Sequence, residues 1–266
     1  MQWEQLPAPE FAKAVRQTGV CVVSMGVLEK HSEHLPVGTD VLNGHRVVCM
    51  AAEKEPAVVF PPFYFGQINE ARCYPGCLTV KPALLIDLIQ NVCDEIGRNG
   101  FRKIILCNGH GGNGYLLPLL AQCSLWEEKP YQIYVTDSFT VPGQEAEWQA
   151  VLDTKVHGHG CECETSIMLA NYPELVRMDR VPRKPALPLK RLAHLKSLYT
   201  GIWWYGDNPD HYAGDARRAT AAKGKILRAM LVNKLAKYIR IVKKDKGAMA
   251  LSREFFRRER ALRGRA

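Results

Sequence analysis

The stretch that decides the fold is Val20–Asp40, which reads VCVVSMGVLEKHSEHLPVGTD. Its first eight residues, Val20–Val27, form a short apolar run of the kind carried by strands that are buried on both faces. The next residues hold two histidines, two glutamates and an aspartate within twelve positions, beginning at Glu29. A buried strand that runs directly into metal-binding side chains predicts a site at the carboxyl end of a parallel sheet.

Apolar runs and helical spacing alternate along the rest of the chain. The further strands we expect are Val58–Phe60, Lys103–Cys107 and Gln132–Thr136. The helices we expect are Val41–Lys54, Ala83–Arg98, Gly112–Leu125, Glu164–Asn171 and Ala216–Val242. Strands that alternate with helices predict an α/β fold, a three-layer sandwich with a mostly parallel sheet and helices on both faces.

A glycine-rich segment, Asn108–Gly114 (NGHGGNG), directly follows the expected strand Lys103–Cys107. Gly109–Gly114 satisfies the G-x-G-x-x-G pattern of dinucleotide-binding turns, and Asp137 ends the next strand, where an acid would bind ribose. The alternatives are a turn that needs glycine for its backbone angles and a site in which His110 binds a metal. All three readings stay open on this segment alone.

A third polar cluster lies in His157–Ser166 (HGHGCECETS). It offers His159 for proton transfer, and Glu162 and Glu164 as carboxylate ligands. The alternative for the two glutamates is an acidic first helical turn, which the helix dipole favours.

Taken together, these segments resemble the creatininase (creatinine amidohydrolase) family. The family motif G-x-x-E-x-H-x-x-H-L-P-x-G-T-D is matched by Gly26–Asp40, and N-G-H-G-G-N by Asn108–Asn113. The later motif H-A-G-E-x-E-T-S is matched by His159–Ser166 with two changes. Tyr74–Thr79 and Gly214–Gly224 are similar to two further family segments, so the resemblance runs from about residue 20 to 225.

The resemblance implies a hydrolase with two divalent metal ions per subunit, either Zn, Mn or Fe. Glu29 and His110 would hold one ion, His31 and a further carboxylate would hold the other, and Asp40 would bridge them. His159 would transfer protons or contact the substrate. Two divalent ions can acidify a water molecule and polarise a carbonyl group, and a nearby histidine can pass a proton to the leaving group.

One departure from the family bears on the substrate. In creatinine hydrolases the second motif is similar to N-G-H-Y-E-N. This chain has Gly111 and Gly112 in place of the Tyr and Glu of that motif. The missing carboxylate has to come from elsewhere, and we expect Glu162 to be the fifth metal ligand. Glu164 is the alternative ligand and is otherwise expected beside His159 as a catalytic residue. We therefore expect a substrate other than creatinine.

Four residues are predicted to bind the substrate. Cys77 and Gly111 lie inside segments that match the family. Trp203 and Tyr205 belong to the aromatic segment 202–212, which we expect to cover the site and set its specificity. A packed surface loop is the alternative for that segment.

The predicted reaction is hydrolysis of the C–N bond of a small amide, lactam or formamide through a metal-activated water. One alternative is hydrolysis of a cyclic ketone of the inosose kind by C–C cleavage. The other is a nucleotide-binding protein without enzyme activity that uses Gly109–Gly114. By the same resemblance we expect a homo-oligomer, similar to a hexamer.

The net charge of +9 is concentrated at the C-terminus, because 15 Lys/Arg and 3 Asp/Glu lie from Lys223 onward. We interpret this excess as a solvated helix and tail, and we expect no nucleic-acid partner because no aromatic residues interleave with it. The predicted organisation is a hydrolase domain over residues 1–245 and a basic helical tail over residues 246–266.

Nine cysteines, an odd number scattered singly, argue against a disulfide framework and favour a reducing cytoplasm. Cys161 and Cys163 are two residues apart, unlike the usual C-x-x-C zinc pair, so we expect buried thiols there. The sequence contains no apolar run of about 18 residues, so we expect no membrane span. The first residues do not have the pattern of a signal peptide.

Overall fold

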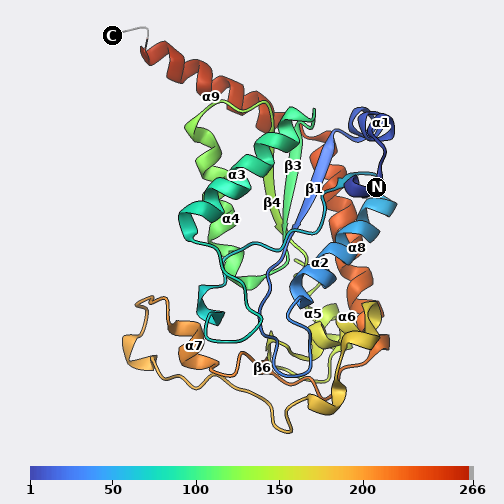
Figure 1. The fold of residues 1–266 in the computed structure, drawn as a ribbon, viewed down its shortest axis with the longest axis vertical. Coiled ribbons are helices and arrows are strands. Elements are labelled where there is room, and N and C mark those ends of the chain that lie inside the picture. Colours follow the sequence, from blue (N-terminus) through green and yellow to red (C-terminus); the bar gives the residue numbers. More distant parts are fainter. Residues whose placement is uncertain (264–266) are drawn as a thin grey trace.

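A four-stranded sheet forms the centre of the computed structural model, which describes residues 1–263. The strands are β1 (Val20–Met25), β2 (Val58–Val59), β3 (Lys103–Asn108) and β4 (Gln132–Asp137). Their order is β2-β1-β3-β4, and each neighbouring pair is parallel. Figure 1 shows β1, β3 and β4 side by side.

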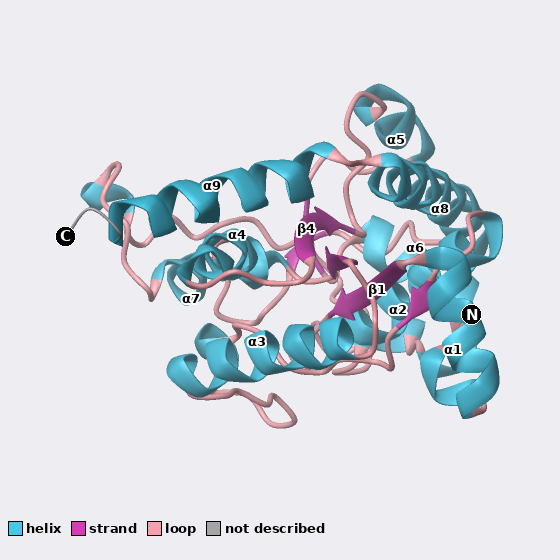
Figure 2. Ribbon diagram, turned by 90° about the horizontal axis from the view of Figure 1, so that it is seen from above, coloured by secondary structure: helices cyan, strands magenta, loops and turns pink. Residues whose placement is uncertain are grey.

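Helices cover both faces of this sheet. The side chains of Val20 and Val22 pack in one core with helices α2 (Thr39–Lys54) and α8 (Ala221–Lys244). Those of Cys21, Val23 and Met25 pack in a second core with helices of the opposite face. These helices are α1 (Ala8–Thr18), α3 (Pro82–Arg98) and α4 (Leu116–Cys123). Figure 2 views the sheet between α8 and α3, which confirms the predicted three-layer α/β fold.

The remaining elements lie around the carboxyl end of the sheet and at the C-terminus. They are α5 (Glu145–Val151), β5 (His157–His159), α6 (Glu162–Asn171), α7 (Trp203–Asp207), β6 (Ala213–Gly214) and α9 (Gly247–Arg263). Strands β5 and β6 pair antiparallel. Short 3-10 turns occupy Trp3–Gln5, Asn69–Ala71, Gly111–Gly114, Ser124–Trp126, Pro173–Leu175, Met178–Arg180 and Ala193–Leu195.

Helices α6 and α8 approach each other so closely that only glycine fits at one contact. A Cβ atom on Gly224 would lie 1.8 Å from the backbone oxygen of Ser166. A larger residue there would push the two helices apart. Since α6 carries Glu162 and Glu164, this contact fixes where both carboxylates lie relative to the sheet.

Several element boundaries differ from the sequence prediction. Helix α8 begins at Ala221 rather than Ala216, because the hydroxyl of Thr220 accepts a hydrogen bond from the amide of Lys223 at 3.2 Å and caps the helix there. Helix α1, which the sequence analysis did not predict, ends at Gly19 in the left-handed region (φ 62°). The expected helix over 112–125 is divided into a 3-10 turn and α4.

The C-terminal tail predicted over residues 246–266 contains α9, which follows α8 after a break at Asp245–Lys246. Figure 1 shows α9 extending from the top of the molecule. Residues 264–266 lie outside the described part of the chain. Within residues 1–263, no helix has both the length and the apolar content needed to cross a membrane.

Candidate active site

The sheet brings the first two polar clusters together. Met25 and Asn108, the last residues of β1 and β3, are in register, and the amide of Gly109 donates to the oxygen of Met25 at 2.8 Å. The segments that follow these strands carry Glu29 and His110. Helix α2 begins close by, because Gly26 has no side chain that would collide with its first turn. That turn returns Asp40 to the same place.

Four of the five predicted metal ligands converge here: Glu29, His31, Asp40 and His110. Their exposed fractions range from 0% to 7%. The Nδ1 atom of His110 lies 2.8 Å from Glu29 Oε1 and 3.0 Å from Asp40 Oδ2. On the other side of the aspartate, His31 Nε2 lies 3.0 Å from Asp40 Oδ1. Asp40 therefore presents one oxygen to each of two imidazole rings.

Backbone carbonyls determine which ring nitrogens carry protons. The Nε2 atom of His110 lies 2.8 Å from the backbone oxygen of Gln67, and the Nδ1 atom of His31 lies 3.2 Å from that of Glu29. Since a carbonyl oxygen only accepts, each of these nitrogens carries the N–H. The other nitrogen of each ring faces Asp40, and it offers a lone pair there whenever the ring is neutral. With neutral rings the centre would present lone pairs to carboxylate oxygens, so it takes up positive charge, either as a second proton on each ring or as a metal ion.

A neighbouring pair of side chains orients Glu29. The indole Nε1 of Trp204 donates to His211 Nδ1 at 3.2 Å, so the His211 proton is on Nε2. That Nε2–H donates to Glu29 Oε2 at 2.8 Å. The other oxygen, Glu29 Oε1, and Asp40 Oδ2 are buried and accept no hydrogen bond from any residue of the described chain. Buried acceptors without donors are rare in proteins and indicate a missing positive partner.

His211 contacts Glu29 at this centre, and no pattern in the sequence singles it out. It lay inside the aromatic segment 202–212, outside the family motifs considered. In the structure it has a positive φ of 52°, and its backbone oxygen accepts from the amide of Ser32, which itself has φ 56°. Left-handed angles at two non-glycine residues are costly and concentrate at functional sites. A positive φ at histidine has no signature in a single sequence.

The charges at this centre respond to one another. Burial raises the pKa of Glu29, but the facing His110, His159 and His211 outweigh it and hold that pKa well below its usual range. Burial lowers the pKa of His31, but Asp40 and Glu29 raise it to about 10. The pKa of His110 is likewise raised well above its usual value, against the effect of burial. The negative potential at this point therefore attracts positive charge.

Glu162, the predicted fifth ligand, does not join this cluster. Its carboxylate accepts hydrogen bonds from the amides of Asp153 and Thr154 at 3.1 and 2.8 Å, and it pairs with the ammonium group of Lys223. These donors satisfy the charge of Glu162 and hold it on the α8 side of α6. The geometry thus contradicts the assignment of Glu162 as a metal ligand.

Glu164, the alternative ligand, is the carboxylate of α6 that faces the centre. Two residues along a helix turn a side chain by about 200°, so Glu164 points away from the Glu162 partners. Its Oε2 accepts from the amide of Gly160 at 2.6 Å. Burial, Cys161 and Asp40 raise its pKa to about 8, against the effect of His31. A Cβ atom on Gly160 would lie 3.6 Å from the backbone oxygen of His31, so the Gly160 amide holds the Glu164 carboxylate on the His31 side of α6.

His159 lies directly against this centre. Its ring centroid is 4.0 Å from that of His31, and its Nε2 is 2.8 Å from the backbone oxygen of Lys30. Burial and the neighbouring His31 lower the pKa of His159 to about 3, so its ring is neutral at pH 7. A neutral ring whose Nε2–H donates to a carbonyl has Nδ1 as its proton acceptor.

Of the two neighbouring tryptophans, Trp204 faces the centre rather than the predicted Trp203. The Trp204 ring lies 5.8 Å from His159 and 5.9 Å from His211. Trp203 is 43% exposed, because adjacent residues on α7 point about 100° apart. Tyr205 packs under the guanidinium group of Arg191, with 5.3 Å to the ring centroid.

The two other predicted substrate residues each lie next to a residue adjoining the cluster. The Sγ atom of Cys77 accepts from the amide of Lys30 at 3.2 Å, directly after Glu29. Gly111 is exposed, and a Cβ atom added to it would meet nothing within 4 Å. It follows His110 and leaves open space beside that histidine.

The glycine-rich segment has a structural explanation that does not involve a nucleotide. A Cβ atom on Gly112 would lie 2.4 Å from His110 Nε2, so glycine is needed for His110 to reach Gln67. Asp137, the candidate ribose ligand, already pairs with Lys234 at 2.9 Å and accepts from the amide of Thr140 at 2.7 Å. Both features count against the nucleotide-binding alternative.

The sequence profile of the creatininase family, described as creatinine amidohydrolase, matches residues 4–239. Creatinine amidohydrolase of Pseudomonas putida is 30% identical over 63% of this chain and 70% of its own length. The mycofactocin precursor peptide peptidase of Mycolicibacterium smegmatis is 27% identical over 86% of this chain and 87% of its own. The 3-dehydro-scyllo-inosose hydrolase of Thermotoga maritima is 26% identical over 90% and 82%.

Solved structures of creatininase share the fold. One of creatinine amidohydrolase has a TM-score of 0.81 at 23% identity, covering 92% of this chain and 98% of that chain. A mutant described as the Zn–Zn type has a TM-score of 0.80 at 25% identity, covering 92% and 98%. One described as creatininase Mn has 0.78 at 24%, covering 92% and 99%. The protein that carries this cluster of carboxylates and imidazoles therefore belongs to the creatininase family of metal-dependent hydrolases.

Proposed function

We propose that this hydrolase cleaves the C–N bond of a small amide, lactam or formamide at a centre of two divalent ions, Zn, Mn or Fe. The observation that carries the proposal is the set of buried carboxylate oxygens and imidazole nitrogens that face one another around Asp40. Two carboxylate oxygens there accept no hydrogen bond from residues 1–263, and an imidazole nitrogen faces both of them within 3.0 Å. Imidazole and carboxylate together suit these metals.

The two ion positions follow from the two sides of Asp40. Glu29, Asp40 and His110 would hold one ion, and their ligand atoms lie within 4.8 Å of one another. His31, Asp40 and Glu164 would hold the other, with Glu164 in the place first assigned to Glu162. Ions bound there would lower the pKa of a water molecule and polarise the scissile carbonyl.

Residues around the centre have separate roles in this proposal. His211, whose proton position is fixed by Trp204, holds Glu29 Oε2, so that Oε1 faces His110 and would be available to a metal ion. His159 accepts a proton at Nδ1 and passes it to the leaving nitrogen. Its neutral state at pH 7 suits a proton acceptor, because a ring that already carried both protons could accept none.

The substrate is proposed to be larger than creatinine. Gly111 and Gly112 replace the Tyr and Glu of the creatinine hydrolase motif, and the space beside Gly111 is open. Two of the relatives are named for a peptide and for an inosose as substrates. The second candidate reaction, hydrolysis of a cyclic ketone by C–C cleavage, is favoured by the match to the inosose hydrolase over 90% of this chain. A rate assay with creatinine, N-formyl amines, short peptides and inososes distinguishes these classes.

Metal content tests the centre itself. Plasma mass spectrometry of the purified protein should find Zn, Mn or Fe, and the Glu29→Gln and His110→Asn variants should lose metal while remaining folded by circular dichroism. Asp137→Asn is the matched control, since that carboxylate has its own cation in Lys234. A folded wild type that neither contains nor takes up these metals would refute the proposal.

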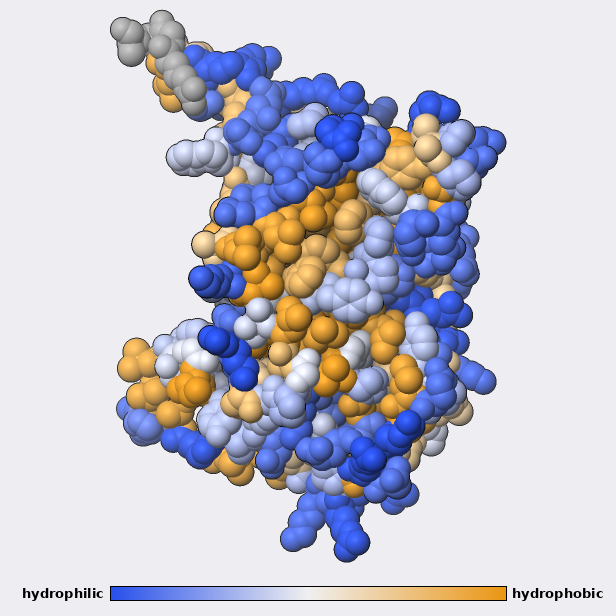
Figure 3. All heavy atoms as spheres, in the orientation of Figure 1, coloured by the Kyte–Doolittle hydropathy of each residue, from blue (hydrophilic) through white to orange (hydrophobic). Residues whose placement is uncertain are grey.

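Assembly and location stay predictions. A homo-oligomer is supported by apolar side chains exposed on α3 and α4, among them Leu84 and Leu119. Figure 3 shows an apolar area across the middle of this face of the molecule. Light scattering of the purified protein measures the subunit number, and a monomer would contradict the prediction. The cytoplasmic location rests on cysteine usage and is checked by cell fractionation.

A further inference from the structure

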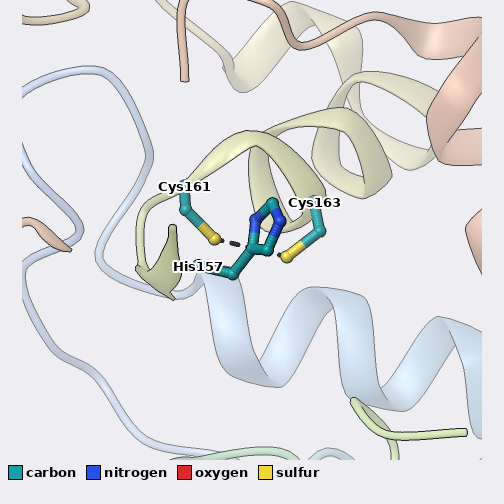
Figure 4. A group of neighbouring side chains, drawn as sticks. All are labelled: His157, Cys161 and Cys163. Atoms are coloured by element: carbon teal, nitrogen blue, oxygen red, sulfur yellow. Dashed lines mark hydrogen bonds between the residues drawn. The ribbon is translucent and has the colours of Figure 1, made fainter. Parts of the chain in front are cut away.

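A second group of metal-binding side chains lies at the start of α6, outside the carboxylate centre. His157, Cys161 and Cys163 each offer a ligand atom, and these atoms lie within 4.8 Å of one another. The two Sγ atoms are 3.2 Å apart. Figure 4 shows the imidazole of His157 between the two sulfur atoms in this view. None of these three residues belongs to the centre described above.

The proton position on His157 leaves one nitrogen free to bind a metal. The side-chain nitrogen of Gln149, Nε2, donates to the backbone oxygen of Thr154 at 2.8 Å. The side-chain oxygen of Gln149 is therefore the atom that faces His157 as an acceptor. That oxygen lies 3.2 Å from His157 Nε2, which places the ring proton on Nε2. The lone pair is then on Nδ1, a buried atom with no hydrogen-bond partner among residues 1–263. Metal-binding histidines are usually held in this way.

The backbone around the group leaves little freedom. His157 is paired with Gly214 across the β5–β6 ladder. A Cβ atom on Gly214 would lie 2.8 Å from the Cβ of Cys161, so only glycine lets Cys161 sit there. Cys163 packs against the core formed with α8. The three ligands are therefore held in place by backbone pairing and core packing before any ion binds.

We propose that His157, Cys161 and Cys163 bind one thiophilic cation, Zn²⁺, with solvent as the fourth ligand. Two thiolates on a tetrahedral zinc at about 2.3 Å are about 3.8 Å apart, so the sulfurs need to separate slightly from 3.2 Å. Binding releases one proton from each thiol, and the two thiolate charges neutralise the ion. The C-x-C spacing suffices because His157 supplies the third ligand from β5.

The proposed ion would join β5 to the first turn of α6. His159 ends β5, and Glu164 lies in the first turn of α6. A bound ion would therefore fix the separation between the proton acceptor and a ligand of the carboxylate centre. This inference does not depend on the proposed reaction, because the sulfur-containing group is complete without the carboxylate centre.

Cobalt(II) is the probe that separates the two centres, since only thiolate ligands give strong sulfur-to-cobalt absorption in the near ultraviolet. Co²⁺ is titrated anaerobically into the reduced wild type, the Cys161→Ser/Cys163→Ser double variant and a Cys123→Ser control. The band should grow to one ion per chain in the wild type and in the control, be absent from the double variant, and disappear on adding Zn²⁺. Total bound Zn²⁺ should be one ion lower in the double variant than in the control.

A further variant keeps the test decisive if the double variant does not fold. His157→Gln retains both thiols and should weaken Co²⁺ binding by at least about tenfold. Changes to residues that only support a metal ligand already lower affinity by about that much. Absence of the band from the folded wild type, its persistence in the double variant, or unchanged affinity in His157→Gln would overturn the proposal. A loss of two hydrogens before metal addition, seen in the Cys123→Ser control and absent from the Cys161→Ser/Cys163→Ser variant, would show a Cys161–Cys163 disulfide instead and would also overturn it.

Discussion

Two regions at the carboxyl end of the same sheet carry carboxylates, and the groups that face those carboxylates differ. Asp137, at the end of β4, pairs with the ammonium group of Lys234 and accepts from Thr140. Glu29 and Asp40, beyond the end of β1, face imidazole nitrogens that can bind a proton or a metal ion, and no other group of the described chain donates to Glu29 Oε1 or Asp40 Oδ2. A carboxylate at this edge of the sheet therefore does not by itself identify a candidate site. The absence of donors around it does.

The largest predicted effect comes from removing carboxylate oxygens of the proposed centre. Asp40→Asn replaces one carboxylate oxygen of Asp40, which faces both His31 and His110, by an NH₂ donor. We therefore expect loss of metal and a fall in kcat/KM of about 10³-fold or more. The matched change Asp137→Asn should retain metal and activity and destabilise folding by about 1–3 kcal/mol. Metal analysis, steady-state rates and thermal melting check the pair. Equal metal loss in both variants would remove the contrast between the two regions.

The next effect concerns the group that orients Glu29. His211→Ala removes the donor to Glu29 Oε2, and loss of such outer contacts typically lowers metal affinity about 10- to 100-fold. Competition with a chelator at fixed pH measures the change. Unaltered affinity in a folded His211→Ala protein would mean that Glu29 is positioned without it.

Protons compete with metal at the centre. The pKa of His31 in the metal-free protein is about 10, above its ordinary value of 6.5. The stability that its proton adds is fully present below pH 6.5 and is lost as pH rises toward 10. A metal has to displace that proton, so its affinity should rise about tenfold per pH unit for each proton displaced.

Two measurements check this linkage. The melting temperature of the metal-free protein should fall between pH 6.5 and 10, and the metal-loaded protein should lose less stability over that range. Metal affinity measured at pH 7 and pH 8 gives the slope. Asp137→Asn should show the same slope as the wild type, and a slope of zero in the wild type would exclude displacement of a proton.

The smallest effect separates two adjacent aromatic residues. Trp204→Phe keeps the ring and removes the donor to His211, which should lower kcat/KM roughly two- to tenfold, the value of one hydrogen bond. Trp203→Phe, the same change on an exposed neighbour, should have no measurable effect. If Trp203→Phe is the more damaging variant, substrate contacts on the outer face of α7 matter more than the orientation of His211.

Sequence patterns could predict the layered fold and the meeting of the first two polar clusters. Buried parallel strands have a distinctive apolar composition, and their carboxyl ends meet at one edge, so Glu29 and His110 were expected together. The choice between Glu162 and Glu164 depended on rotation about α6, which a single sequence leaves open. The Lys223 partner of Glu162 is 61 residues away in the chain, and no local pattern reveals that pair.

His211 and Trp204 could not be predicted for a related reason. Both act through contacts made by a segment with little regular structure, and the position of that segment depends on long-range packing. Adjacent tryptophans are equivalent in composition, and only the helical turn of α7 makes Trp204 face His159 while Trp203 is exposed. The unusual backbone angle of His211 likewise depends on its bond to Ser32.

The peptide carbonyls that hold His31 and His110 also affect how such an enzyme evolves. A substitution changes a side chain but leaves a backbone oxygen at its position, so the carbonyls of Glu29 and Gln67 keep holding the two rings while neighbouring side chains diverge. The ring orientations are thus protected from most mutations. Side chains such as Trp203, Tyr205 and the residue at Gly111 are free to change without disturbing them, so new substrates can be selected around a conserved hydrolytic centre.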